Sequence, residues 1–131
     1  MSISQSSLKK LVLVVEDEPI IRMCAVDLVE SVGFIAVEAA NADEAVQLIE
    51  KGLDISVLFT DVDMPGSMDG LELIKVVREK RPEVGVIIAS GRRMMSPAEL
   101  PSPARFFPKP YDEGRISEAL RELSNGVEFK G

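Results

Sequence analysis

Short apolar runs alternate with longer amphipathic stretches along this chain. The runs are mostly unbroken series of branched and aromatic residues, which is typical of strands that are buried on both faces. The predicted strands cover residues 11–15, 34–37, 55–59, 84–89 and 105–107. Because helical stretches alternate with these runs, the pattern predicts an α/β fold, in which helices cover both faces of a doubly wound parallel sheet.

The stretches between the strands repeat their apolar residues at helical spacing. The first helix is predicted over residues 19–32, with an apolar face that includes Cys24, which is expected to be buried. Asn41 is predicted to cap the second helix, and Asp69 opens the third. The last helix is marked by Ile116, Ala119, Leu120 and Leu123. Three prolines within residues 96–103 leave room for about one or two turns, so a fourth helix there is expected to be short or broken.

Composition and charge narrow the possible functions. A chain of 131 residues suits one core, and we expect a polar tail over residues 1–8, a domain over 9–124 and a second tail over 125–131. A net charge of -7 disfavours direct binding to nucleic acid. No signal peptide or membrane-length apolar run is evident, so a cytoplasmic protein without membrane insertion is expected. With one cysteine and no histidine, any acid–base or metal chemistry must come from carboxylates.

Reactive side chains follow four of the five predicted strands. Glu16 and Asp17 come after the first strand, Asp61 after the third, Ser90 after the fourth and Lys109 after the fifth. Ligands of open parallel sheets bind outside the carboxyl ends of the strands. Each residue alone would be an ordinary surface group, but their joint placement predicts one site at this edge.

The predicted site suits a divalent cation and a phosphoryl group. Its three carboxylates repel one another by on the order of a few kcal/mol per close pair, so a cation must offset their charge. Oxygen ligands without imidazole or thiolate favour Mg²⁺. Mg²⁺ and a lysine ammonium would neutralise the phosphoryl oxygens, and Asp61 at the centre of the edge would be the nucleophile.

These residues resemble the receiver domains of two-component response regulators, in particular single-domain regulators of the chemotaxis type. The resemblance spans roughly residues 8–124. It rests on Glu16-Asp17, Asp61 with Met64-Pro65 and Asp69-Gly70, Ser90-Gly91 and Lys109-Pro110. It implies a flavodoxin-like sheet of five parallel strands in the order 2-1-3-4-5, and a cis peptide bond between Lys109 and Pro110.

The resemblance also implies a function and a metal site. Asp61 would accept a phosphoryl group from a histidine kinase or a histidine phosphotransfer protein. Asp17, Asp61 and the backbone carbonyl of Asp63 would bind Mg²⁺, with Glu16 acting through water. The protein would catalyse only its own phosphorylation and dephosphorylation, and so would not be a turnover enzyme.

Further positions match or depart from the family pattern. Ser90 matches the switch hydroxyl, Lys109 the lysine that contacts phosphate, and Phe106 the rotating aromatic residue, here without the hydroxyl of tyrosine. The loop over residues 65–70 is about one residue longer than usual, and the interval before Lys109 is shorter and rich in proline. Arg92 is hypothesised to shield the phosphoryl group and so to change the lifetime of the acyl phosphate.

The sequence leaves several functions open. We expect a stand-alone receiver, which either binds a partner through its phosphorylated surface or carries phosphate between histidines as a relay or sink. One alternative is a phosphohydrolase of the haloacid-dehalogenase type, because residues 58–63 resemble its motif and Asp63 would be its general acid/base. Another is a receiver-shaped interaction module that is not phosphorylated.

Overall fold

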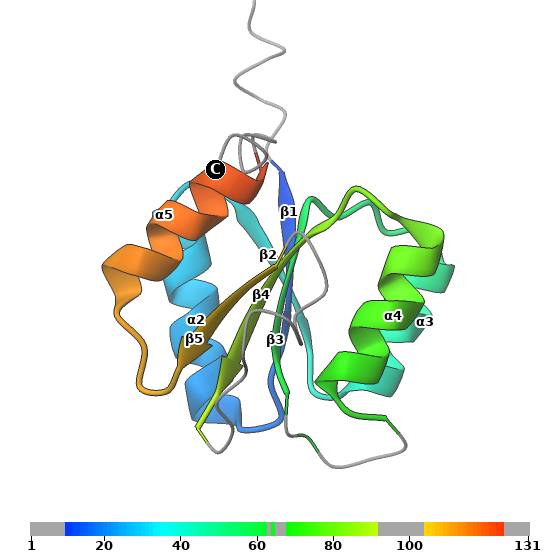
Figure 1. Ribbon diagram of the computed structural model, residues 1–131, viewed down its shortest axis with the longest axis horizontal. Coiled ribbons are helices and arrows are strands. Elements are labelled where there is room, and N and C mark those ends of the chain that lie inside the picture. Colours follow the sequence, from blue (N-terminus) through cyan, green and yellow to red (C-terminus); the bar gives the residue numbers. More distant parts are fainter. Residues whose placement is uncertain (1–9, 63, 65–67, 92–103, 125–131) are drawn as a thin grey trace, which may run out of the picture.

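The computed structural model describes residues 10–62, 64, 68–91 and 104–124, which contain five strands and four helices (Figure 1). In chain order they are β1 (Leu11–Val15), α2 (Pro19–Ser31), β2 (Ile35–Ala39), α3 (Ala42–Glu50), β3 (Val57–Asp61), α4 (Gly70–Lys80), β4 (Gly85–Ser90), β5 (Ala104–Pro108) and α5 (Glu113–Ser124). None of the helices in these described ranges is long and apolar enough to cross a membrane. The expected tails and the short helix within residues 96–103 lie outside the described residues.

All five strands are parallel and form one sheet in the order β2-β1-β3-β4-β5. Helices α2 and α5 cover one face of this sheet, and α3 and α4 cover the other (Figure 1). Successive side chains of a strand point to opposite faces, so Val12 and Val14 belong to the α2/α5 core, while Leu13 and Val15 belong to the α3/α4 core. The predicted fold class and strand order are confirmed.

One expectation about the first helix is wrong, because Cys24 is exposed. The buried stripe of α2 consists of Ala25, Leu28 and Val29. Each residue turns a helix by about 100°, and Cys24 lies one position before Ala25, on the solvent side of that stripe. Met23 beside it is also exposed, at 59%. The apolar face of α2 that meets the sheet is therefore narrower than the sequence pattern suggests.

The start of α4 is fixed by a capping box. The Asp69 side chain accepts a hydrogen bond from the Glu72 backbone N–H at 3.0 Å, and the Glu72 side chain accepts one from the Asp69 N–H at 3.2 Å. These two contacts satisfy N–H groups that have no partner inside the helix. The box therefore fixes the residue at which α4 begins.

We expect Asp69→Ala to lower the free energy of unfolding by about 1 kcal/mol, because a capping acceptor is lost. Chemical denaturation followed by circular dichroism measures this change. Asp54→Ala is the matched control: its exposed side chain pairs with Arg81 at 3.1 Å, so its loss should cost less than about 0.5 kcal/mol. Equal losses in the two variants would contradict the assigned cap.

Candidate functional site

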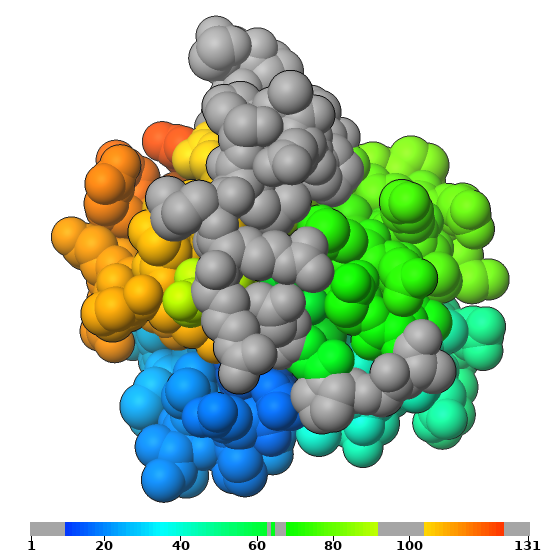
Figure 2. All heavy atoms as spheres, turned by 60° about the horizontal axis from the view of Figure 1, so that its bottom comes forward, coloured from blue at the N-terminus to red at the C-terminus, as the bar shows by residue number. Residues whose placement is uncertain are grey.

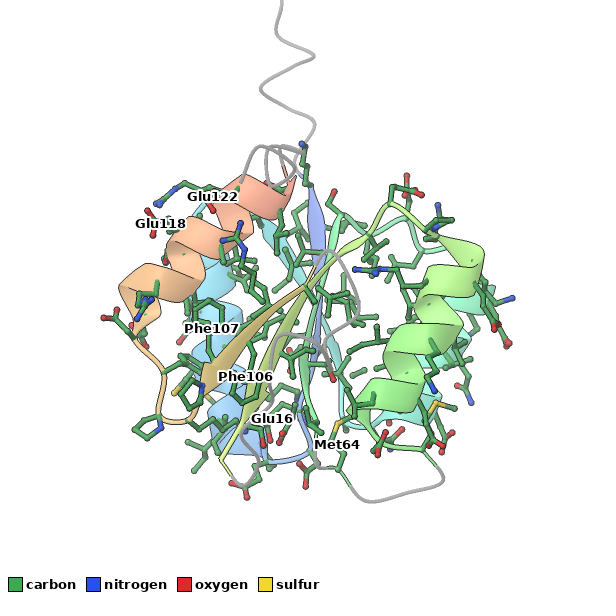
Figure 3. The ribbon with its side chains drawn as sticks, viewed as in Figure 1. Glu16, Met64, Phe106, Phe107, Glu118 and Glu122 are labelled. Carbon is green, nitrogen blue, oxygen red and sulfur yellow. The ribbon has the colours of Figure 1, made fainter. Side chains whose placement is uncertain are left out.

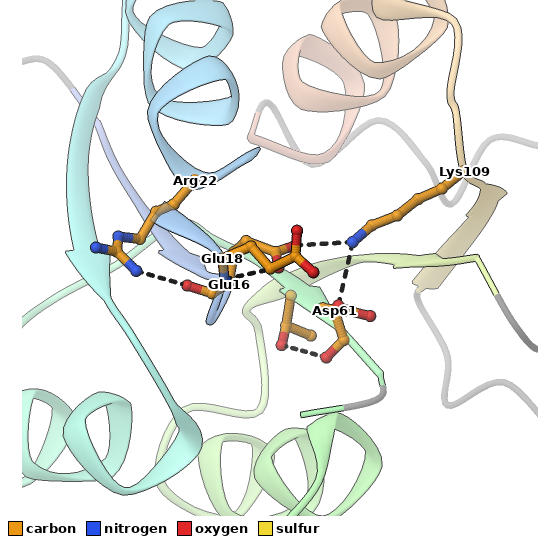
Figure 4. A network of polar contacts seen from close by, with 6 residues as sticks. Glu16, Glu18, Arg22, Asp61 and Lys109 are labelled. Carbon is orange, nitrogen blue, oxygen red and sulfur yellow. Dashed lines mark hydrogen bonds and ion pairs between the residues drawn. The ribbon is translucent and has the colours of Figure 1, made fainter. Parts of the chain in front are cut away.

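Three strand ends contribute charged side chains that touch one another. Glu16 directly follows β1, Asp61 is the last residue of β3, and Lys109 directly follows β5. The Lys109 ammonium donates hydrogen bonds to Glu16 Oε1 at 2.8 Å and to Asp61 Oδ2 at 3.1 Å (Figure 4). The peptide bond between Lys109 and Pro110 is cis, as expected. The carboxyl ends of the strands lie at the lower edge of Figure 1, and Figure 2 turns that edge toward the viewer.

A cluster of carboxylates surrounds this contact. Glu16, Asp17 and Asp61 each offer an oxygen atom, and these atoms lie within 4.8 Å of one another. Glu16 is only 5% exposed and Asp61 only 9%, so water screens their repulsion poorly. The donor set consists of hard oxygen atoms with a high negative charge, which fits a small divalent cation such as Mg²⁺. The three acids carry more negative charge than the single ammonium of Lys109, which contacts two of them, can offset, and a cation would balance the remainder.

Burial and hydrogen bonding shift the pKa values of Glu16 and Lys109. Burial raises the pKa of Glu16, because it disfavours the charged form, and hydrogen bonds from Lys109 and the Glu18 backbone N–H oppose this only in part. For Lys109, burial alone would lower the pKa, but the hydrogen bonds to Glu16 and Asp61 outweigh it and raise the pKa. Lys109 therefore stays a cation at neutral pH and holds the two acids together.

The predicted switch residues lie on two neighbouring strands, β4 and β5. Ser90 is the last residue of β4 and is fully buried, and its carbonyl accepts a hydrogen bond from the Lys109 backbone N–H at 2.9 Å. Phe106 lies on β5 and packs against the α3/α4 core, whereas Phe107 packs on the other face (Figure 3). Asp63 and Arg92, which the sequence also singles out, lie outside the described residues.

Two residues of the site carry no signal in the sequence pattern. Arg22 of α2 donates a hydrogen bond to the backbone carbonyl of Glu16 at 2.8 Å. Tyr111 lines a small cavity together with Glu16, Asp61 and Lys109, its ring centroid lies 5.8 Å from that of Phe59, and burial raises its pKa. Both reach the site through the fold alone, because neither lies at a strand end.

Comparisons with known proteins agree on one family. The family model described as the response regulator receiver domain matches residues 12–121. A chemotaxis protein CheY homolog of Campylobacter jejuni is 32% identical over 117 residues, which cover 85% of this chain and 89% of that protein. The sensor kinase CckA of Brucella abortus is 34% identical over 116 residues, or 86% of this chain, but this chain spans only 12% of the kinase's length. A response regulator receiver protein of Sinorhizobium medicae has the same fold, with a TM-score of 0.84 and 22% identity, over 92% of this chain and 98% of that one.

Proposed function

This chain belongs to the receiver domains of two-component response regulators, and from that premise we propose that Asp61 accepts a phosphoryl group from a histidine kinase or a histidine phosphotransfer protein. The observation that carries the proposal is the hydrogen bond between Lys109 Nζ and Asp61 Oδ2 inside a cluster of three acids, of which Glu16 and Asp61 are buried. A lysine ammonium beside a carboxylate nucleophile is already where negative charge would develop on the phosphoryl oxygens. The same family membership supports a cytoplasmic location for the reaction.

In the proposed transfer, the bonds that form and break involve only groups of this site and the donor, and Mg²⁺ would assist by offsetting charge. A carboxylate oxygen of Asp61 attacks the phosphorus atom, the bond from phosphorus to the donor nitrogen breaks, and its electron pair leaves with the histidine. Lys109 stabilises charge on the equatorial oxygens, and the Ser90 hydroxyl donates a hydrogen bond to one of them. The product is an acyl phosphate on Asp61. The domain thus acts on itself and is not a turnover enzyme.

The carboxylates of Glu16, Asp17 and Asp61 would hold Mg²⁺ in this proposal, with the backbone carbonyl of Asp63 as a further ligand. When bound, Mg²⁺ offsets the negative charge of the acids and of the incoming phosphoryl oxygens. Lys109 already contacts both Glu16 and Asp61 without it, so the cation would add charge neutralisation to a site that is formed by the protein itself.

The test is to incubate the protein with acetyl phosphate and Mg²⁺ and to follow its mass. One hydroxylamine-labile phosphoryl group is expected per chain. Removal of Mg²⁺ with EDTA should slow the labelling at least about a hundredfold, because the acids then repel the donor, and excess Mg²⁺ should restore it. Equal labelling with and without EDTA would refute the metal site, and no labelling in Mg²⁺ would refute the proposal.

The finer function depends on what the phosphorylated domain does next. Two roles are proposed: binding a partner protein through a phosphorylation-dependent surface, or passing the phosphoryl group on as a relay or sink. Rapid transfer back to a histidine protein would support the relay. A phosphohydrolase of the haloacid-dehalogenase type is disfavoured, because its aspartate normally ends the first strand and Asp61 ends β3, the third along the chain.

A further inference from the structure

Arg22 connects the acidic cluster to the edge strand β2. Its Nη1 donates a hydrogen bond to the backbone carbonyl of Glu16 at 2.8 Å, and its Nε donates one to Glu38 Oε1 at 3.0 Å (Figure 4 shows the first). The Arg22 side chain is 20% exposed, whereas that of Glu38 is 54% exposed. The planar guanidinium therefore spans the end of β1 and the end of β2 in one fixed orientation.

The carbonyl that Arg22 binds belongs to the peptide bond between Glu16 and Asp17. That peptide unit is planar, so holding its oxygen fixes the orientation of the whole plane. The residues on its two sides supply two of the three clustered carboxylates. The Glu16 backbone N–H is also held, since it donates a hydrogen bond to the Ala39 carbonyl of β2 at 3.2 Å. The main chain of Glu16 is thus fastened to β2 directly through Ala39 and indirectly through Arg22.

We propose that Arg22 is a positioning residue, which orients the Glu16–Asp17 peptide so that both carboxylates face a divalent cation. This inference rests on the proposed function, because it assumes that the cluster binds Mg²⁺. Within the described part of the chain, Arg22 hydrogen-bonds to the main chain of Glu16 and to the Glu38 side chain, and neither of these groups reacts in the proposed transfer. Its role resembles that of the outer hydrogen-bond partners that hold metal ligands in other proteins.

The direction in which the Mg²⁺ affinity changes when Arg22 is replaced distinguishes a positioning role from a purely electrostatic one. A guanidinium near a divalent cation repels it, so the charge of Arg22 alone predicts that Arg22→Gln binds Mg²⁺ more tightly. Positioning predicts the opposite, because the freed peptide can rotate and carry both carboxylates away from the cation. Arg22→Lys keeps the charge but has a single ammonium in place of the fork, so charge alone predicts no change, whereas positioning again predicts weaker binding.

The experiment titrates each variant of the full chain with Mg²⁺. Tyr111 is the only tyrosine, and the chain has no tryptophan, so its fluorescence reports on the cavity beside Glu16 and Lys109 without interference. Calorimetry gives the same dissociation constant independently. We expect Arg22→Gln to raise the dissociation constant for Mg²⁺ about tenfold or more, and Arg22→Lys to raise it by a smaller factor. At saturating Mg²⁺, the labelling rate with acetyl phosphate should return close to that of the wild type.

Arg81→Gln is the matched control. Arg81 also pairs with an exposed acid, Asp54, at 3.1 Å, and its side chain is 27% exposed, but it lies outside the carboxylate cluster. Its Mg²⁺ affinity should equal that of the wild type. An Arg22→Gln variant that is folded by circular dichroism and binds Mg²⁺ as tightly as Arg81→Gln would overturn the inference. If Arg22→Gln does not fold, a folded Arg22→Lys variant that binds Mg²⁺ as tightly as Arg81→Gln would overturn it instead. A wild-type chain that binds no Mg²⁺ would instead refute the proposed metal site itself.

Discussion

Asp61→Asn is expected to abolish phosphoryl transfer from acetyl phosphate. The asparagine side chain has nearly the same shape, but its amide oxygen is a poor nucleophile and cannot form an acyl phosphate. The variant should stay folded, because Lys109 keeps its hydrogen bond to Glu16 at 2.8 Å and the repulsion within the cluster falls. Mass spectrometry in Mg²⁺ should show no hydroxylamine-labile phosphoryl group, while the circular dichroism spectrum is that of the wild type.

Asp54→Asn provides the control for this loss. It removes the same charge from an acid whose side chain is 80% exposed and whose ion pair with Arg81 is on the surface. The variant should be labelled as fast as the wild type. A labile phosphoryl group on the Asp61→Asn chain would show that another residue accepts it and would remove Asp61 from the proposed role. Partner binding that is indifferent to Asp61→Asn would support the unphosphorylated interaction module.

Gly70→Ala should cause the largest loss of stability among single-methyl changes near the site. A Cβ atom at Gly70 would overlap the backbone oxygen of Asp61 and lie 2.9 Å from the Cα of Val62. Both are main-chain atoms at the end of β3, so they cannot rotate away as a side chain can. We expect a loss of about 3 kcal/mol, seen as a fall of roughly 10 °C in the melting temperature. Relief of the overlap would also move Asp61. The rate of labelling with acetyl phosphate should therefore be lower than in the wild type, even at temperatures at which the variant is fully folded.

Gly114→Ala tests whether this effect comes from the overlap. Gly114 also lies in the first turn of a helix, α5, but a Cβ there meets only the Asp112 side chain, at 3.2 Å. A small movement of Asp112 accommodates the methyl group, and alanine is the better helix former by about 1 kcal/mol. Stability should be unchanged or higher. If both variants lose stability equally, the close approach of α4 to Asp61 is not what requires glycine.

Much of the fold could be predicted because the buried part of a strand and the part that is hydrogen-bonded to a neighbouring strand usually end at the same residue. They coincide at β1, which is Leu11–Val15 as predicted. They differ at β3, which was predicted over residues 55–59 but is Val57–Asp61. Ile55 is buried before the strand begins, and Asp61 remains in the strand because it pairs with Ala89 of β4. An apolar run indicates burial, and only the neighbouring strand determines where pairing begins and ends.

The site could be predicted as far as its residues follow strand ends. Parallel strands bring those ends to one edge, which is why Glu16 and Lys109, 93 positions apart, are in contact. The contact of Arg22 could not be predicted, since its acceptor is a backbone carbonyl, which every residue has. The exposure of Cys24 was missed for a related reason: helical spacing gives the centre of a buried stripe but not its width.

The two contacts of Lys109 leave room for a third. An ammonium group has three N–H bonds, and here one is directed to Glu16 and one to Asp61. Among the residues that the structure describes, none takes the remaining hydrogen. If Asp61 accepts a phosphoryl group as proposed, one of its oxygens could accept this third hydrogen bond while Lys109 keeps its hydrogen bond to Glu16. We expect the phosphoryl group to add one hydrogen bond to the existing network, so that the Lys109 side chain needs little rearrangement before the transfer.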